Sequence, residues 1–220
     1  MRRILTALLA AFLLLAACGC QKKSSEALRF KSEYEQLNGQ KDENGRPYPE
    51  ITIPEDNTVR YVDEEKICEA FENGTHVIYL GWPQCGWCRR MLPVLLSTVR
   101  QYSGISVYYF NMKDARQAFE DGSDEKLAQV YLNIVEELKL DDYDISGEVS
   151  HYDDGTMKIP SSLVFFIKEG EIIGAHKRTV ESHLDSYEPL TEDQAGELAD
   201  IYRTYLEEMV RKVAPGCDDC

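Results

Sequence analysis

Short apolar runs of strand length alternate with amphipathic helical patterns along most of this chain of 220 residues. The runs that predict strands lie at 58–62, 76–82 and 105–112, and two more, joined by Lys-Glu-Gly-Glu, lie within 162–180. The patterns that predict helices lie at 63–74, 86–102, 123–140 and 191–213. Because uninterrupted apolar strands have to be covered on both faces, this order predicts an α/β fold with a central sheet flanked by helices.

Two cysteines lie where the strand at 76–82 gives way to the helix at 86–102, in the stretch HVIYLGWPQCGWCRRMLP. A cysteine in the first turn of a helix faces unpaired backbone N–H groups and the positive end of the helix dipole, and both stabilise a thiolate. Cys88 follows Cys85 by about one turn and can close on it. The pair therefore predicts thiol–disulfide exchange, with Cys85 as nucleophile and Cys88 as the resolving thiol. The arginines that follow could add positive charge or point into solvent.

The remaining cysteines leave alternatives open. Cys217 and Cys220 form a second C-x-x-C at the C-terminal end, and this accessory dithiol could relay electrons, bind a soft metal or close on itself. A zinc site made by both pairs is a further alternative, but structural zinc sites draw their ligands from compact local segments. We therefore expect no metal and no cofactor. Cys68 falls on a helix face with Phe71 and is expected to be a small core residue.

The N-terminus has the pattern of an export signal. Met1-Arg2-Arg3 precedes an uncharged run that ends at Ala17, and this run is shorter than the ~20 residues that a membrane span needs. The tetrapeptide LAAC, which ends at Cys18, resembles the lipobox of bacterial lipoproteins. This resemblance implies that residues 1–17 are removed and that Cys18 carries the lipid anchor. An ordinary cleaved signal is the alternative, and Cys20 is a competing position for processing.

Charge and composition divide the rest of the chain. The net charge of −15 becomes −17 when the signal and its two arginines are removed, which argues against nucleic acid as a partner and against a basic membrane-binding face. Residues 18–50 are mostly polar and predict a tether, with one short amphipathic patch at 27–37. The folded domain is expected over 51–214, followed by a tail at 215–220.

Two distant motifs resemble the thioredoxin family. CGWCRRMLP resembles the active-site helix, including its proline, and KIPSSLVFFIKEGEIIGAHKR resembles the cis-proline loop with its following hairpin. The resemblance implies a thioredoxin fold with a central mixed sheet, and Pro160 as the cis-proline. It also implies that the backbone of Ile159 is free to pair with a substrate peptide, and that Trp82, Gly86 and Trp87 contact substrate.

The chain departs from the family pattern at two places. The family has a buried acid six residues before its first cysteine, where this chain has Tyr79. Water, or an acid such as Glu72 or Asp114, would then have to move the proton of the resolving thiol. Residues 113–157 are a longer segment than thioredoxins have there, which predicts a helical insertion before Pro160 together with an acidic connection.

The whole chain resembles, more narrowly, the lipid-anchored thioredoxin-like proteins of Gram-positive bacteria that are labelled bacteriocin-transport accessory proteins. It is therefore expected to be an extracytoplasmic thiol–disulfide oxidoreductase, held at the bacterial cell membrane by its lipid. Its expected partners are protein or peptide thiols and disulfides and a redox partner that the sequence does not identify. The alternative is a non-catalytic accessory protein that binds an exported peptide or a secretion component.

Overall fold

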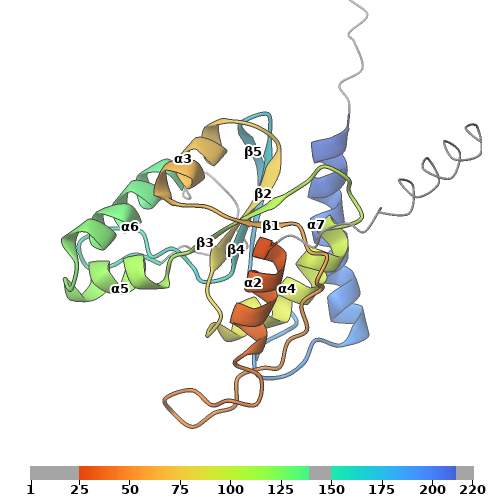
Figure 1. The fold of residues 1–220 in the computed structure, drawn as a ribbon, viewed down its shortest axis with the longest axis horizontal. Coiled ribbons are helices and arrows are strands. Elements are labelled where there is room, and N and C mark those ends of the chain that lie inside the picture. The colour runs from red at the N-terminus through yellow and green to blue at the C-terminus, as the bar shows by residue number, and fades with distance from the viewer. Residues whose placement is uncertain (1–24, 139–149, 212–220) are drawn as a thin grey trace, which may run out of the picture.

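A five-stranded mixed sheet forms the centre of the computed structural model, which describes residues 25–138 and 150–211. The strands lie side by side in the order β1-β3-β2-β4-β5 (Figure 1). Their bounds are Val59–Tyr61 for β1, His76–Gly81 for β2, Val107–Asn111 for β3, Leu163–Lys168 for β4 and Glu171–Lys177 for β5. β1 and β2 run parallel to β3, whereas β4 is antiparallel to both β2 and β5. The predicted central sheet is confirmed.

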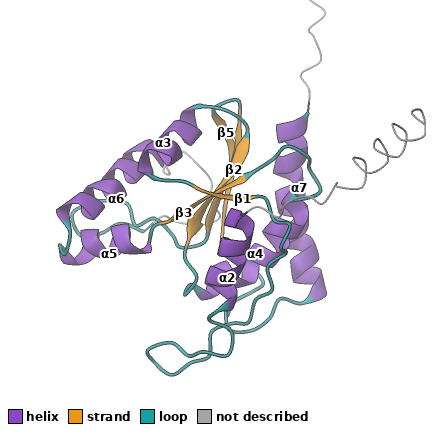
Figure 2. Ribbon diagram, in the orientation of Figure 1, coloured by secondary structure: helices purple, strands orange, loops and turns teal. Residues whose placement is uncertain are grey.

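Helices cover both faces of this sheet, as Figure 2 shows. The helices are α2 (Ser25–Glu35), α3 (Glu64–Glu72), α4 (Gly86–Val99), α5 (Lys113–Asp121), α6 (Glu125–Leu138) and α7 (Glu192–Val210). Buried residues of α2, α4 and α7 form one core cluster with the sheet, and those of α3, α5 and α6 form the other. Within β2 all residues are buried, and successive side chains enter opposite clusters, as the two-residue period of a strand requires.

The N-terminal region differs from the expected tether. Ala27, Phe30 and Tyr34 form one buried stripe of α2, at the spacing by which a helix presents residues on one face. Phe30 packs on Tyr109 of β3, with ring centroids 4.9 Å apart. The prediction of a polar tether is therefore wrong for residues 25–50, because the aromatic stripe has a sheet face to cover. Residues 18–24 lie outside the described part of the chain.

The expected insertion between β3 and β4 contains two helices where one was predicted. α6 matches the pattern at 123–140, and α5 precedes it without a side-chain cap at its start, Met112. Ala115 and Ala118 are the buried residues of α5, and such small side chains make a weak amphipathic signal. The acidic connection that was predicted after α6 falls mostly on residues 139–149, outside the described part of the chain.

The loop that precedes β4 differs from the expectation of a cis-proline. No peptide bond in the described residues is cis, so the bond before Pro160 is trans, which is the conformation that X–Pro bonds favour. The chain turns into β4 through Ser162, whose φ of 72° lies in the left-handed region. Among the described residues, no helix combines the length and the apolar character that crossing a membrane requires.

Candidate functional site: the dithiol at the start of α4

Cys85 lies between β2 and α4, at the N-cap position of the helix. A turn carries the chain from β2, in which the Cys85 N–H donates to the Trp82 carbonyl oxygen at 3.2 Å. The Cys85 sulfur then accepts a hydrogen bond from the Cys88 N–H at 3.1 Å. The sulfur thus takes the place of the side-chain oxygen that usually caps a helix, and it lies against the N–H groups of the first turn, as the sequence predicted.

These hydrogen bonds decide the acidity of Cys85. Burial by itself raises the pKa of the thiol, but hydrogen bonds from the Cys88 thiol, the Ser161 hydroxyl and the backbone N–H groups of Cys88 and Trp87 outweigh it. The net result is a pKa below the ordinary value for cysteine. A donor that points at sulfur stabilises the thiolate more than the thiol, because the thiolate is the better acceptor. Cys85 is thus the more easily ionised sulfur of the pair.

Cys88 has the opposite character. It is fully buried, and burial, followed by the hydrogen bond with Cys85 and its charge, raises the pKa of its thiol well above the ordinary value. Hydrogen bonds from the Tyr79 hydroxyl and the Trp82 backbone act in the other direction but do not cancel this effect. Both cysteines are free thiols. In this reduced state the pair consists of a nucleophile that ionises easily and a partner that holds its proton.

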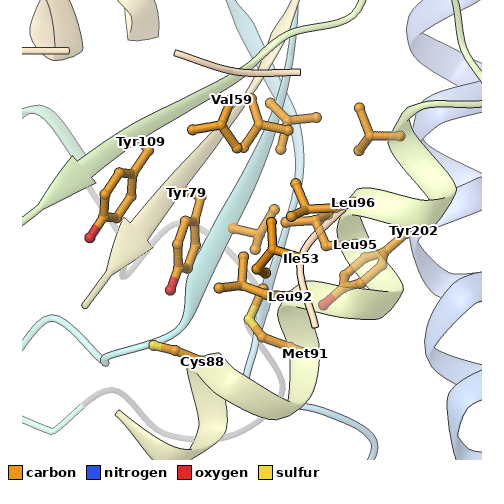
Figure 3. Close-up of a cluster of buried hydrophobic side chains, with 14 of the residues drawn as sticks. Ile53, Val59, Tyr79, Cys88, Met91, Leu92, Leu95, Leu96, Tyr109 and Tyr202 are labelled. Atoms are coloured by element: carbon orange, nitrogen blue, oxygen red, sulfur yellow. The ribbon is translucent and has the colours of Figure 1, made fainter. Parts of the chain in front are cut away.

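Tyr79 supplies a polar group on the buried side of Cys88. Its hydroxyl is directed toward Cys88 from the sheet, as Figure 3 shows, and it shares a hydrogen bond of 2.8 Å with the hydroxyl of Tyr34 from α2. Of the acids that the sequence offered as substitutes for the family's buried carboxyl group, Glu72 and Asp114 are both exposed. The group that contacts Cys88 where an acid was expected is therefore a tyrosine hydroxyl, linked to a second one.

Arg89 joins the dithiol helix to the N-terminal segment. Only 1% of its surface is exposed, which differs from the expectation that it adds charge to the site or points into solvent. Its guanidinium donates to the Tyr34 carbonyl oxygen at 2.7 Å, to Asn38 Oδ1 at 2.5 Å and to the Pro49 carbonyl oxygen. The first of these acceptors lies in the last turn of α2, where carbonyl groups lack partners within the helix. Arg89 is therefore a buried structural cation.

The exposed part of the dithiol is small. Cys85 keeps 8% of its surface accessible and Cys88 keeps none, so the nucleophile is less open than the sequence suggested. Trp87 lies next to this opening, half-buried, with its ring edge-on to His183 at 5.4 Å between centroids. The guanidinium of Arg178 lies 5.4 Å from the centroid of the Trp87 ring. The Trp87 backbone N–H donates to the Cys85 sulfur, so a substrate that bonds to this sulfur lies close to Trp87.

The other residues expected to contact substrate differ in their surroundings. Trp82 is partly buried and packs against both core clusters, and the Arg116 guanidinium lies 5.9 Å from its ring centroid. A Cβ atom added to Gly86 would come within 2.5 Å of the Ser186 hydroxyl. Gly86 therefore permits a close approach of the loop before α7 and does not line an open surface.

Ile159 does not present the free backbone that was expected beside Pro160. Its N–H donates to the Tyr131 hydroxyl at 3.0 Å, and its carbonyl oxygen accepts from Arg116 at 3.4 Å. Both partners come from the inserted helices α5 and α6, which the expectation from the resemblance did not include. Pro160 itself is half-buried and lines a cleft with Ser161.

The other cysteines lie apart from this arrangement or outside the described part of the chain. Cys68 lies on α3, is half-buried and packs against the opposite core cluster, so it lies at the edge of the core where a core residue was expected. Cys18, Cys217 and Cys220 all lie outside the described residues. Within residues 25–138 and 150–211, no three histidine, cysteine or acidic side chains gather in a way that could hold a metal ion.

Comparisons with known proteins add one structural likeness. No family model matches the sequence, and no curated protein matches it. Among solved structures, the crystal structure of thioredoxin O2 from Arabidopsis thaliana in the oxidised state is similar, with 14% sequence identity and a TM-score of 0.39. The similarity covers 71% of this chain and 96% of that one. The mixed five-stranded sheet flanked by helices, the antiparallel pairing of β4 and the dithiol at the start of α4 agree with the thioredoxin fold that the sequence motifs imply.

Proposed function

We propose that this protein is a thiol–disulfide oxidoreductase that acts on protein or peptide disulfides. The observation that supports the proposal is the Cys85 sulfur at the helix N-cap, with a lowered pKa and the Cys88 thiol hydrogen-bonded to it. The thiolate is the nucleophile in disulfide exchange, and a second thiol within reach allows the mixed disulfide to be resolved. The two sulfurs thus have the unequal acidities that this sequence of steps uses.

The reaction transfers two electrons from the dithiol to a client. The Cys85 thiolate forms a bond to one client sulfur, the client S–S bond breaks, and the departing client thiolate takes a proton from solvent. Cys88 then loses its proton and attacks the Cys85 sulfur, so that the second client thiolate leaves and a Cys85–Cys88 disulfide remains. Because the same atoms carry out the reverse reaction, the reduction potential of the pair sets the direction.

The small exposed fraction of Cys85 favours a second candidate function. A thioredoxin-like accessory protein could bind an exported peptide or a secretion component at the same face without turnover, and it would not need an open sulfur. With 8% of its surface accessible, Cys85 can be reached only by a client that packs closely against the protein. The two candidates differ in whether a covalent intermediate forms.

Replacement of the resolving cysteine separates the two candidates. A Cys88→Ala protein should accumulate mixed disulfides with clients, because the bond to Cys85 forms and no second thiol releases it. These adducts should appear on non-reducing gels and disappear with dithiothreitol. Cys68→Ala is the matched control, since it removes a cysteine of the opposite core cluster and should trap nothing. If Cys88→Ala forms no adducts with disulfide-bonded clients, the oxidoreductase proposal is wrong.

We also propose that the chain acts outside the cytoplasm of a bacterium, attached to the cell membrane through a lipid on Cys18. The support is the N-terminal sequence alone, with its basic start, apolar run and LAAC ending. An oxidising compartment is also where disulfide clients persist. Expression of the full chain with radiolabelled palmitate should label the membrane fraction, and Cys18→Ala should remove the label. A label that survives this change would contradict the assignment of the anchor.

A further inference from the structure

We propose that the cationic cleft beside Cys85 binds acidic segments of client polypeptides and so selects disulfides that are flanked by carboxylates. This inference rests on the proposed thiol–disulfide exchange and names its substrate class. The cleft is defined here by Trp87, the segment 158–161, Lys177, Arg178, Arg116 and Ser150, and it encloses about 330 Å³. A hollow of this size accommodates a few side chains of an extended segment.

The cleft reaches the reactive sulfur through two of its own lining residues. Ser161 and Trp87 both line the cleft, and both donate hydrogen bonds to the Cys85 sulfur, Ser161 from its hydroxyl and Trp87 from its backbone N–H. A client segment seated in the cleft therefore lies directly beside the one accessible sulfur of the pair. Because Cys85 forms the bond to the client, the residues that line the cleft can contact the client residues next to its cysteine.

Four cationic side chains line this cleft, whereas the chain as a whole has a net charge of −15. They come from three separate parts of the fold: Arg116 from α5, Lys158 from the loop before β4, and Lys177 with Arg178 from the end of β5. No carboxylate is among the described residues that line it. Such a gathering of like charges on an acidic protein needs an explanation, because like charges repel each other at close range.

One acid neutralises part of this charge. Glu120 accepts a hydrogen bond from Arg116 at 2.9 Å and from the Tyr152 hydroxyl at 2.6 Å. Glu181 lies beyond Arg178 in a neighbouring hollow. Burial, and then the charge of Arg178, lower the pKa of Lys177, so these two neighbours oppose each other. An anion bound between them would relieve this repulsion, and a carboxylate is the anion that a polypeptide carries.

The shape favours a polypeptide over a small acid. A second hollow of about 240 Å³ lies beside the first and shares Trp87, Lys177 and Arg178 with it. Leu184 lines this second hollow and is 87% exposed. The two hollows share an aromatic ring and two cations, and the second hollow also contains Glu181 and an apolar side chain. An extended segment with acidic residues beside its cysteine can fill both, whereas a small acidic disulfide fills one.

The range of electrostatic interactions in salt solution determines whether a bound carboxylate interacts with the cations of the cleft or with the net negative charge of the whole protein. At an ionic strength of 0.1 M the screening length is about 10 Å, which is shorter than the size of the domain but longer than a contact in the cleft. A bound carboxylate therefore interacts mainly with the cations of the cleft, and the distant acids are screened. At 1 M salt the length falls to about 3 Å, and the local attraction weakens as well.

The test uses two peptide disulfides of equal length, one with glutamates and one with glutamines beside the cysteines. The ratio of their kcat/KM values at 0.1 M salt should favour the acidic peptide by about fivefold or more, since exposed and partly buried ion pairs each contribute about 0.2–1 kcal/mol. In Lys158→Gln/Arg178→Gln the ratio should fall toward one. In the wild-type protein, 1 M salt should reduce it likewise.

A matched control removes two positive charges elsewhere. Lys66→Gln/Arg100→Gln changes an exposed lysine of α3 and the residue that follows α4, at the far end of that helix from Cys85. This double variant should keep the wild-type ratio. Urea unfolding of each variant checks that it folds, and the salt dependence of the wild-type protein needs no variant at all. Equal rates for the two peptides in the wild-type protein would overturn the proposal while leaving the oxidoreductase function intact.

Two further outcomes distinguish a failure of the proposed oxidoreductase function from a failure of the proposed substrate class. If the wild-type protein turns over neither peptide, the proposed function has failed, and with it the inference about the substrate. Glutathione disulfide, a small acidic disulfide, serves as the third substrate and should lose less than twofold in the double variant. An equal loss for glutathione disulfide and the acidic peptide would assign the cleft to small acidic molecules and overturn the assignment to polypeptides.

Discussion

The two sulfurs of the site are three residues apart in the sequence, and their surroundings differ in exposure, polarity and origin. Cys85 faces backbone N–H groups and the hydroxyl of Ser161, a residue that lines the cationic cleft, and its pKa is lowered. Cys88 faces Tyr79 and the apolar core, and its pKa is raised. One helical turn thus separates an ionisable nucleophile from a protected thiol. The difference shows that the position on the helix and the packing around it, not the C-x-x-C motif, set the acidity of each sulfur.

The surroundings of Cys88 depend on the N-terminal segment, which Arg89 joins to α4. Of the changes considered, Arg89→Ala is expected to have the largest effect, a decrease in the free energy of unfolding. This change removes a guanidinium donor from the Tyr34 and Pro49 carbonyl oxygens and from Asn38 Oδ1, and it opens a cavity beside the dithiol helix. Loss of one partner of such a buried charged network typically costs about 3–5 kcal/mol. Urea unfolding of the reduced protein should show a decrease of this size in the free energy of unfolding.

Arg90→Ala is the control for this prediction. The neighbouring guanidinium is half-buried and donates to the Ser186 and Tyr187 carbonyl oxygens. Its loss should cost about 1 kcal/mol, because those acceptors lie nearer to solvent. Equal losses in the two variants would show that the N-terminal segment is not held to the dithiol helix by Arg89, and the contrast between the two sides would lose its structural basis.

Tyr79→Phe tests the polar contact on the Cys88 side. The Tyr79 hydroxyl stabilises the Cys88 thiolate, so its removal should raise the pKa of Cys88 further and slow the resolution of the mixed disulfide. A hydrogen bond to a charged group contributes about 1.5–3 kcal/mol, and each 1.36 kcal/mol is a factor of ten in rate. We expect at least a tenfold slower resolution near neutral pH, measured by stopped-flow mixing with a preformed mixed disulfide.

The reactivity of the Cys85 thiolate, which carries out the first step of disulfide exchange, provides the control for Tyr79→Phe. Alkylation of Cys85 by iodoacetamide should keep its rate, because Tyr79 lies on the side of Cys88. Tyr34→Phe should have the same sign of effect on resolution but a smaller one, since the Tyr34 hydroxyl is hydrogen-bonded to Tyr79 and is one step further from Cys88. If Tyr79→Phe slows alkylation as much as resolution, the two sulfurs do not have the separate surroundings described above.

Ser161→Ala tests the open side and should have the smallest effect. Its hydroxyl donates to the Cys85 sulfur, so its loss should raise the pKa of Cys85. The rate of alkylation should fall by about threefold at pH values below the midpoint and stay unchanged above it, where the thiolate is fully formed. The Ser161 hydroxyl is one of several donors to this sulfur, and the donors that remain keep the thiolate stabilised, so we expect a loss of about 0.5–1 kcal/mol.

The shifted pKa values of Cys85 and Cys88 also make the stability of the reduced protein depend on pH. A thiol whose pKa is lowered on folding stabilises the reduced protein at pH values above the ordinary pKa of cysteine, and this contribution is lost as the pH falls through the folded value. Cys88, with its raised pKa, has the opposite sign and destabilises the reduced protein above the ordinary value. Ser161→Ala should diminish only the first contribution. Urea unfolding of the reduced variant across pH 6–10 measures it, and an unchanged pH profile of both alkylation and stability would contradict the role of Ser161.

Much of the fold could be predicted from local patterns. The strand at 76–82 and the helix at 191–213 were predicted within a few residues of β2 and α7, because their apolar periods and caps are contained in the segments themselves. α2 was recognised only as a short amphipathic patch, although Phe30 and Tyr34 have the spacing of a buried stripe. A stripe of three apolar residues in a polar stretch does not indicate which part of the protein the helix packs against.

The sequence by itself determined the order of the five strands and of α3, α4, α6 and α7, and the place of Cys85 at a strand-to-helix junction, because these follow from apolar periodicity and helix-end chemistry between near neighbours. Tertiary structure alone decided that Arg89 is buried, that Tyr79 meets Tyr34 beside Cys88, and that four cations from three separate segments line one cleft. These features depend on which faces of distant elements meet, and distances between such elements are not contained in any local pattern. Packing of the whole chain therefore sets the surroundings of each sulfur.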